Sequence, residues 1–202
     1  MNFLAHIYLS NGTPESVLGA VLGDFVKGRL HDRFTPGVRE AIRIHRAIDC
    51  YTDAHPVVRE SRRLVSGPRR RYAPILIDLF YDHLLARDWE RYSAVPLADF
   101  TRSAYAVLGA HAHAFPGPFQ RVVPRMAAED WLSAYREPEG IERALAGLSR
   151  RARRGAPLIG GVEELTRNYA ALADQFRAFF AELRGQVATW NRNDECSMLN
   201  AE

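Results

Sequence analysis

The spacing of apolar residues predicts helices along nearly the whole chain, and no segment alternates between apolar and polar residues for long enough to predict a strand. The expected helices cover residues 14–28, 36–53, 57–65, 72–89, 97–114, 119–135, 139–151 and 162–190, after a short apolar segment at residues 1–9. This pattern predicts an all-α fold, a single-domain helical bundle over residues 1–190. The polar residues 191–202 are expected to form a flexible C-terminal tail.

The helix expected at residues 72–89 carries two acids on the face that should turn inward. Asp78 and Asp82 are four residues apart, so they lie about 40° from each other around the helix axis. Apolar residues expected on the same face are Ile75, Leu85 and Trp89. A buried carboxylate costs free energy unless it is paired, hydrogen-bonded or bound to a metal. Pairing with arginine is the simpler alternative, and a metal site requires further ligands from elsewhere.

Other helices supply such ligands on their expected inward faces. The helix at 36–53 places His45 and Asp49 one turn apart, and the helix at 14–28 carries three glycines suited to close approach of another backbone or a ligand. The full set of expected inward polar residues is His6, Asp24, His45, Asp49, Asp53, Asp78, Asp82 and His83. Histidine nitrogens and carboxylate oxygens suit Mn²⁺, Fe²⁺, Mg²⁺ or Zn²⁺. Histidines and acids satisfied within the core remain the alternative.

Composition fits one ordinary globular domain. The chain has 202 residues, of which 47% are hydrophobic and 25% charged. It has two cysteines without metal-ligand spacing, no apolar run long enough for a membrane span and no signal-peptide pattern. These features lead us to expect a cytoplasmic protein with no membrane partner.

Arginine dominates the basic residues. Lys27 is the one lysine, so 27 basic residues minus 1 leaves 26 arginines and a net charge of +3. The clearest cluster comprises Arg59, Arg62, Arg63, Arg69, Arg70 and Arg71. Such a cluster attracts an anionic partner, but a solvated surface or genomic base composition would produce the same residues. No nucleic-acid-binding motif accompanies it, so we expect no nucleic-acid partner.

Several motifs resemble those of the acyl carrier protein phosphodiesterases. They are the opening Met1-Asn2-Phe3-Leu4-Ala5-His6, the segment Gly23-Asp24-Phe25-Val26-Lys27-Gly28, His45-Arg46-Ala47-Ile48-Asp49, Asp82-His83 and Trp131-Leu132 with Tyr135-Arg136. That family is viewed as a branch of the HD phosphohydrolases, helical enzymes that hold divalent metal with His and Asp. The order Asp82-His83 is the reverse of the usual His-Asp order. The resemblance implies an HD-domain-like bundle.

The implied activity is hydrolysis of the phosphodiester between the carrier protein's serine and 4′-phosphopantetheine, with Mn²⁺ the metal that the family suggests and Mg²⁺ or Fe²⁺ as alternatives. We expect the metal ligands to be Asp24, His45, Asp82 and His83. Asp49 and Asp78 would orient the ligands or deprotonate the water, and His6 would protonate the departing serine oxygen. Asp24 would take part in catalysis as a metal ligand. Lys27 and Arg46 would hold the phosphate.

Acyl carrier protein is the partner that the resemblance implies, and its acidic surface would dock on the arginines between Arg59 and Arg71. Two other functions remain open. An HD-type phosphohydrolase acting on a nucleotide or another small phosphodiester would use the same site residues. A non-catalytic helical module that binds an acidic protein would need no metal and would leave the inward acids without a role.

Overall fold

Helices are the only regular secondary structure in residues 1–30, 34–115, 117–151 and 157–199, the parts of the chain that the computed structural model describes. The predicted all-α, single-domain fold is therefore confirmed, whereas its likeness to HD domains stays a prediction. Within these residues, no helix is both long and apolar enough to cross a membrane. The α-helices are α1 Phe3–Tyr8, α2 Pro14–Leu22, α3 Pro36–Ala54, α4 Pro56–Leu64, α5 Ala73–Arg87, α6 Leu97–His111, α7 Gly117–Ala128, α8 Trp131–Ala134, α9 Pro138–Arg151, α10 Val162–Arg167 and α11 Tyr169–Leu199, with short 3-10 helices η1 Gly67–Tyr72, η2 Trp89–Arg91 and η3 Ala112–Ala114.

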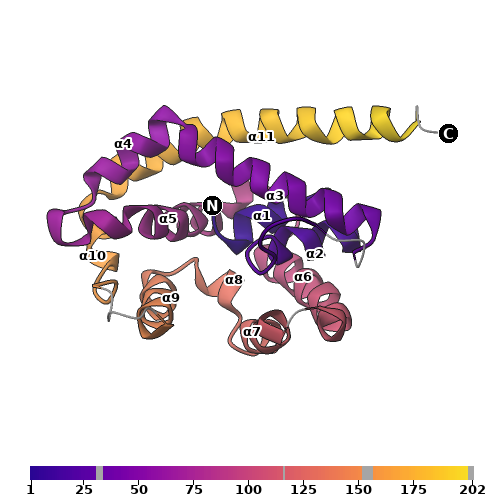
Figure 1. Ribbon diagram of the computed structural model, residues 1–202. Coiled ribbons are helices and arrows are strands. Elements are labelled where there is room, and N and C mark those ends of the chain that lie inside the picture. The colour runs from indigo at the N-terminus through magenta and orange to yellow at the C-terminus, as the bar shows by residue number, and fades with distance from the viewer. Residues whose placement is uncertain (31–33, 116, 152–156, 200–202) are drawn as a thin grey trace.

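The helices are arranged so that the N-terminus lies near the middle of the molecule. In Figure 1, α3, α4 and α11 run along one side, α7, α8 and α9 lie along the opposite side, and α1 and α5 lie between them. The short helix α1 packs against α2 and α5, and α2 packs extensively along α3. The first residues of the chain are therefore surrounded by helices from distant parts of the sequence.

The central helix α5 is buried on almost all sides. Five hydrophobic residues on or just after it are fully buried, namely Leu76, Ile77, Phe80, Leu85 and Trp89. A helix that is buried in this way has no separate polar face. Ile75 was expected to point inward with Leu85 and Trp89, and this prediction is wrong, since Ile75 is 40% exposed. Because α5 is buried, its polar residues need partners from the elements that surround it.

Three predicted helices end early or are interrupted at positions that the apolar periodicity did not indicate. Helix α2 ends at Leu22, and not at residue 28, so that Asp24 lies in a turn that also contains Gly28 at φ +75°. The segment 119–135 divides at Asp130, which has a left-handed φ of +42° and accepts a hydrogen bond from Ser133 N as the N-cap of α8. The segment 162–190 divides at Asn168.

The last helix is longer than the sequence pattern predicted. Helix α11 continues through residue 191 to Leu199, so the backbone of the expected tail is helical over most of its length. Residues 200–202 lie outside the described part of the chain. That residues 191–202 form a flexible tail stays a prediction.

Candidate metal centre

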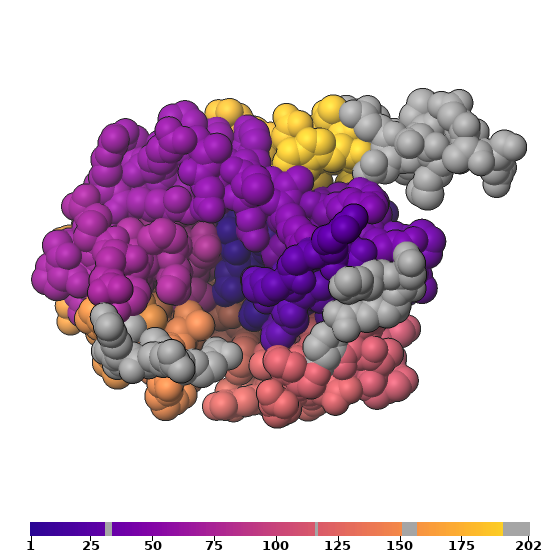
Figure 2. Space-filling model, viewed as in Figure 1, coloured from indigo at the N-terminus to yellow at the C-terminus, as the bar shows by residue number. Residues whose placement is uncertain are grey.

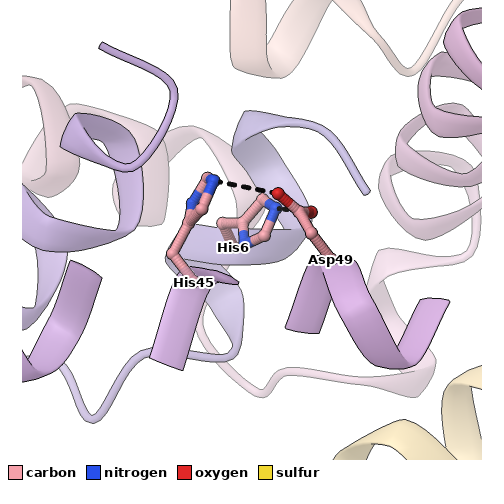
Figure 3. Close-up of side chains that lie close together, drawn as sticks. All are labelled: His6, His45 and Asp49. Atoms are coloured by element: carbon pink, nitrogen blue, oxygen red, sulfur yellow. Dashed lines mark hydrogen bonds and ion pairs between the residues drawn. The ribbon is translucent and has the colours of Figure 1, made fainter. Parts of the chain in front are cut away.

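His6 on α1 meets His45 and Asp49 on α3. His6 Nε2 lies 3.1 Å from Asp49 Oδ1, and His45 Nε2 lies 3.2 Å from Asp49 Oδ2. Figure 3 shows both imidazoles directed at the two oxygens of one carboxylate. The imidazole rings are stacked, with centroids 3.8 Å apart. Among the described residues, these three form the one group of His, Cys, Asp and Glu side chains with ligand atoms all within 4.8 Å of one another.

Helix geometry fixes these side chains. His45 and Asp49 lie one turn apart on α3, as their spacing predicted. The ring of His45 rests against Gly23, where an added Cβ would come within 2.2 Å of His45 Cδ2. Gly19 likewise lets α2 approach α3, since its Cβ would lie 2.2 Å from Ala41 Cβ. The predicted use for close approach is therefore confirmed at Gly19 and Gly23, whereas at Gly28 no described atom lies within 4 Å of an added Cβ.

The donor set fits a divalent cation. His45 Nδ1 lies 2.8 Å from Ala20 O, where it acts as a donor, and this leaves Nε2 to face Asp49. A neutral His45 would then direct a lone pair at carboxylate oxygen, an arrangement that favours a cation between the two groups. Hydrogen bonding of one ring nitrogen to a carbonyl is also how metal-binding histidines are usually oriented.

Protonation states in the cluster suit metal binding as well. Burial, together with the neighbouring His45, lowers the pKa of His6 to about 3, so this imidazole is neutral at pH 7. Burial alone would raise the pKa of Asp49, but the close contacts of its carboxylate with His45, His6 and the Met1 ammonium outweigh burial and hold this pKa well below its usual range. Neutral imidazole and ionised carboxylate are the forms that bind metal.

Two further carboxylates and an ammonium group surround the cluster. Asp24 Oδ1 lies 3.9 Å from His45 Nε2, and the Asp24 side chain is 46% exposed. The buried α-ammonium of Met1 lies 3.1 Å from Asp78 Oδ1 and 3.7 Å from Asp49 Oδ1. Burial lowers the pKa of this ammonium, but Asp78 and Asp49 outweigh that effect and keep the group charged. Asp24 therefore stands beside the cluster, whereas Asp78 binds the ammonium.

The structure does not bring Asp82 and His83 into the cluster. Both carboxylate oxygens of Asp82 are occupied, because Oδ2 accepts Leu4 N at 2.8 Å and Oδ1 accepts Asn2 N and Ala5 N at 3.3 Å each. Asp82 thus satisfies amides at the start of α1 that have no partner within the helix. His83 Nδ1 lies 2.8 Å from Tyr135 O, and its Nε2 is buried with no partner in the part of the chain that the structure describes.

Of the two side chains predicted to hold phosphate, one is hydrogen-bonded within the protein and the other is exposed to solvent. Arg46 donates through both terminal nitrogens to Val26 O and Gly28 O, at 2.8 and 2.9 Å, and so fixes the turn after α2. Lys27 lies exposed in that turn near Asp24. Burial raises the pKa of Asp24, an effect that His45 and Lys27 only partly offset. Lys27 is the better placed of the two for a phosphate.

Most of the predicted arginine docking surface is engaged within the protein. Arg62 pairs with Asp53 and Arg63 with Glu60, so Asp53 is on the surface and not inward. Arg69 donates to Pro157 O and Ile159 O, Arg70 donates to Val65 O, and Arg71 lies over the ring of Tyr72. Only Arg59, exposed on α4, has no such contact among the described residues. The docking role of this group stays a prediction.

Sequence reasoning missed two features of the centre. His6 was expected to transfer a proton, but its Nε2 faces Asp49, a contact that the sequence did not predict, and its Nδ1 is buried with no partner among the described residues. The burial of the Met1 ammonium was also not foreseen. Its signal was the opening Met1-Asn2-Phe3-Leu4-Ala5, which is too apolar for an exposed chain end.

Comparisons with known proteins identify the family of the chain. The family pattern described as "Acyl carrier protein phosphodiesterase" matches residues 1–183. The chain is 37% identical to the acyl carrier protein phosphodiesterase of Serratia proteamaculans over 93% of its own length and 97% of that relative. The Yersinia enterocolitica and Salmonella paratyphi A proteins of the same name are 34% and 35% identical, over 93% of this chain and 97% and 98% of theirs. No solved structure matches. The chain therefore belongs to the acyl carrier protein phosphodiesterase family.

Proposed function

We propose that the protein is a metal-dependent phosphodiesterase that releases 4′-phosphopantetheine from holo acyl carrier protein and leaves the apo carrier protein. The observation that carries this proposal is the cluster of His6, His45 and Asp49, whose N,N,O donors suit a divalent cation. Membership of the family supplies the substrate. Mn²⁺ is the metal we propose, with Mg²⁺ and Fe²⁺ as alternatives.

His6, His45 and Asp49 would hold the metal, and Asp24 lies near enough to His45 to join them. A divalent cation there would make water nucleophilic at neutral pH and offset the charge of the phosphoryl oxygens. This assignment replaces Asp82 and His83, whose hydrogen bonds serve the fold, and it moves His6 from proton transfer to metal binding.

The remaining polar groups have separate roles in the proposal. Asp24 is half-exposed beside the cluster and would accept the proton of the attacking water if it does not bind metal. Lys27 would hold a non-bridging phosphate oxygen from the turn after α2. Asp78 holds the Met1 ammonium beside Asp49 and would thereby position the cluster.

Mass spectrometry of holo acyl carrier protein tests this function. Incubation with the protein and Mn²⁺ should remove the mass of one 4′-phosphopantetheine, and a chelator should prevent the loss. Asp49→Asn should lower the rate by at least about a hundredfold, since it removes a ligand. A carrier protein that keeps its mass, beside a nucleotide phosphodiester that is cleaved, would assign the site to a different substrate.

A further inference from the structure

Two of the four exposed large hydrophobic side chains among the described residues lie beside the 3-10 helix η1. Ile75 is 40% exposed on the first turn of α5, which directly follows η1, and Ile159 is 63% exposed. The carbonyl oxygen of Ile159 accepts a hydrogen bond from Arg69 Nη2, in η1, at 3.2 Å. Exposed apolar side chains that gather in one place indicate an interaction surface, whereas scattered single ones do not.

Helix η1 adds positive charge to this place. Residues 65–77 contain Arg69, Arg70 and Arg71 and no Asp or Glu. Arg69 is paired with the buried Glu164 at 3.4 Å. Arg70 donates its Nε to a backbone carbonyl, and Arg71 lies over the neighbouring tyrosine ring, so neither is paired with a carboxylate in the part of the chain that the structure describes. We define the η1 surface as Arg70, Arg71, Ile75 and Ile159.

The η1 surface leads along α5 to the proposed metal centre. Ile75 and Asp78 are three residues apart, so they lie on one side of α5 and about 4.5 Å apart along its axis. Asp78 Oδ1 lies 3.1 Å from the Met1 ammonium, which lies 3.7 Å from Asp49 Oδ1. A protein bound to the η1 surface would therefore also cover the metal centre.

The figures show the same path. In Figure 1, α5 runs from one edge of the molecule, where α4 and α10 also lie, towards the N-terminus near the middle. In Figure 2, the purple and magenta surface of this edge reaches a depression in which indigo N-terminal residues are visible. The surface and the depression are open to a partner from the same side.

We propose that the η1 surface docks acyl carrier protein. Carboxylates of the partner bind Arg70 and Arg71, and one of its apolar side chains packs on Ile75 and Ile159. Charge complementarity determines the choice of partner, because a basic surface beside the site of reaction attracts and orients an acidic protein. The inference rests on the proposed function for the identity of that protein. It reduces the predicted arginine docking surface to two arginines and adds an apolar contact.

Binding of apo carrier protein tests the surface directly, because the apo form lacks the prosthetic group but keeps the protein surface. We expect the double variant Arg70→Glu, Arg71→Glu to bind at least about tenfold more weakly and with less dependence on salt, since attraction becomes repulsion. Ile75→Ser should weaken binding about threefold or more, since an apolar contact is lost. Isothermal titration calorimetry at low and high salt measures both effects.

Matched control variants lie elsewhere on the surface. Arg121→Glu, Arg143→Glu makes the same charge change at exposed arginines of α7 and α9, and Val95→Ser makes an equivalent apolar-to-polar change at an exposed position. Both controls should bind apo carrier protein with nearly the affinity of the wild-type protein. Thermal melts and Mn²⁺ titration check that each variant is folded and keeps its metal affinity.

The outcomes separate the docking surface from the proposed function. Wild-type affinity in either η1 variant, equal losses in the two double arginine variants, or tighter binding of RNA than of carrier protein would overturn the docking surface, even if the protein releases the prosthetic group. Weaker binding confined to the η1 variants, without any release from holo carrier protein by the wild-type protein, would support the docking surface and overturn the proposed function.

Discussion

At the scale of single residues, two carboxylates that appear equivalent in the sequence have different partners in the structure. Asp49 and Asp82 were both expected on inward helix faces. Asp49 meets two imidazoles, whereas Asp82 meets three backbone amides of α1. Burial raises the pKa of Asp82 to about 7, against the Met1 ammonium and the amides, which favour the charged form. The first acid is thus suited to a cation and the second to holding a helix in place.

Substitution of each acid by asparagine should separate these roles. We expect Asp82→Asn to lower the free energy of unfolding by about 1–3 kcal/mol, because an amide cannot accept all three hydrogen bonds. Its affinity for Mn²⁺ should stay near that of the wild-type protein. Asp49→Asn should abolish metal affinity, and it should also lower the stability of the metal-free protein, because the contacts that lower the pKa of Asp49 stabilise the fold at pH 7. Chemical denaturation and metal titration check both variants. Loss of metal binding in Asp82→Asn with unaltered stability would make Asp82 a ligand.

At the scale of helices, the position of His45 depends on the close packing of α2 on α3. Gly23→Ala would place a methyl group within 2.2 Å of the His45 ring and should displace it, which would weaken metal binding about tenfold or more. Gly109→Ala is a matched control, because nothing lies within 4 Å of its added Cβ. Metal titration of both variants is the measurement. Wild-type affinity in Gly23→Ala would show that the glycine does not position His45.

Another helix contact has a predictable dependence on pH. Glu164 on α10 is buried and accepts hydrogen bonds from Ser66 N and Oγ, with Arg69 and Arg167 nearby. Burial raises its pKa, but these contacts outweigh burial and hold the pKa below the usual 4.5. A lowered carboxyl pKa stabilises the fold above pH 4.5, and this contribution is lost as the pH falls through the folded-state value.

Glu164→Gln should therefore lower the free energy of unfolding by about 1–3 kcal/mol at pH 7. The difference from the wild-type protein should shrink as the pH falls below 4.5, because the wild-type carboxylate becomes protonated there. Urea denaturation at a series of pH values measures the difference. A difference that is constant with pH would show that the charge of Glu164 contributes nothing.

At the scale of the whole molecule, the sequence predicted the helices better than the contacts between them. Periodicity identified α3, α5 and α9 because their apolar spacing is regular. It missed the break at Asp130, which depends on a left-handed residue and a side-chain cap. It identified His45 and Asp49 because both lie on one helix, but it could not show that Asp82 would meet the amides of α1, since that contact joins residues about 80 positions apart.

The central claim is that His6, His45 and Asp49, from two helices, hold a divalent cation. Anomalous scattering from a crystal of the wild-type protein grown with Mn²⁺ tests it most directly. We predict a peak bound by His6 Nε2, His45 Nε2 and a carboxylate oxygen of Asp49. A peak at Asp82 and His83, or an active Mn²⁺-loaded enzyme with no peak at the three predicted ligands, would contradict the account.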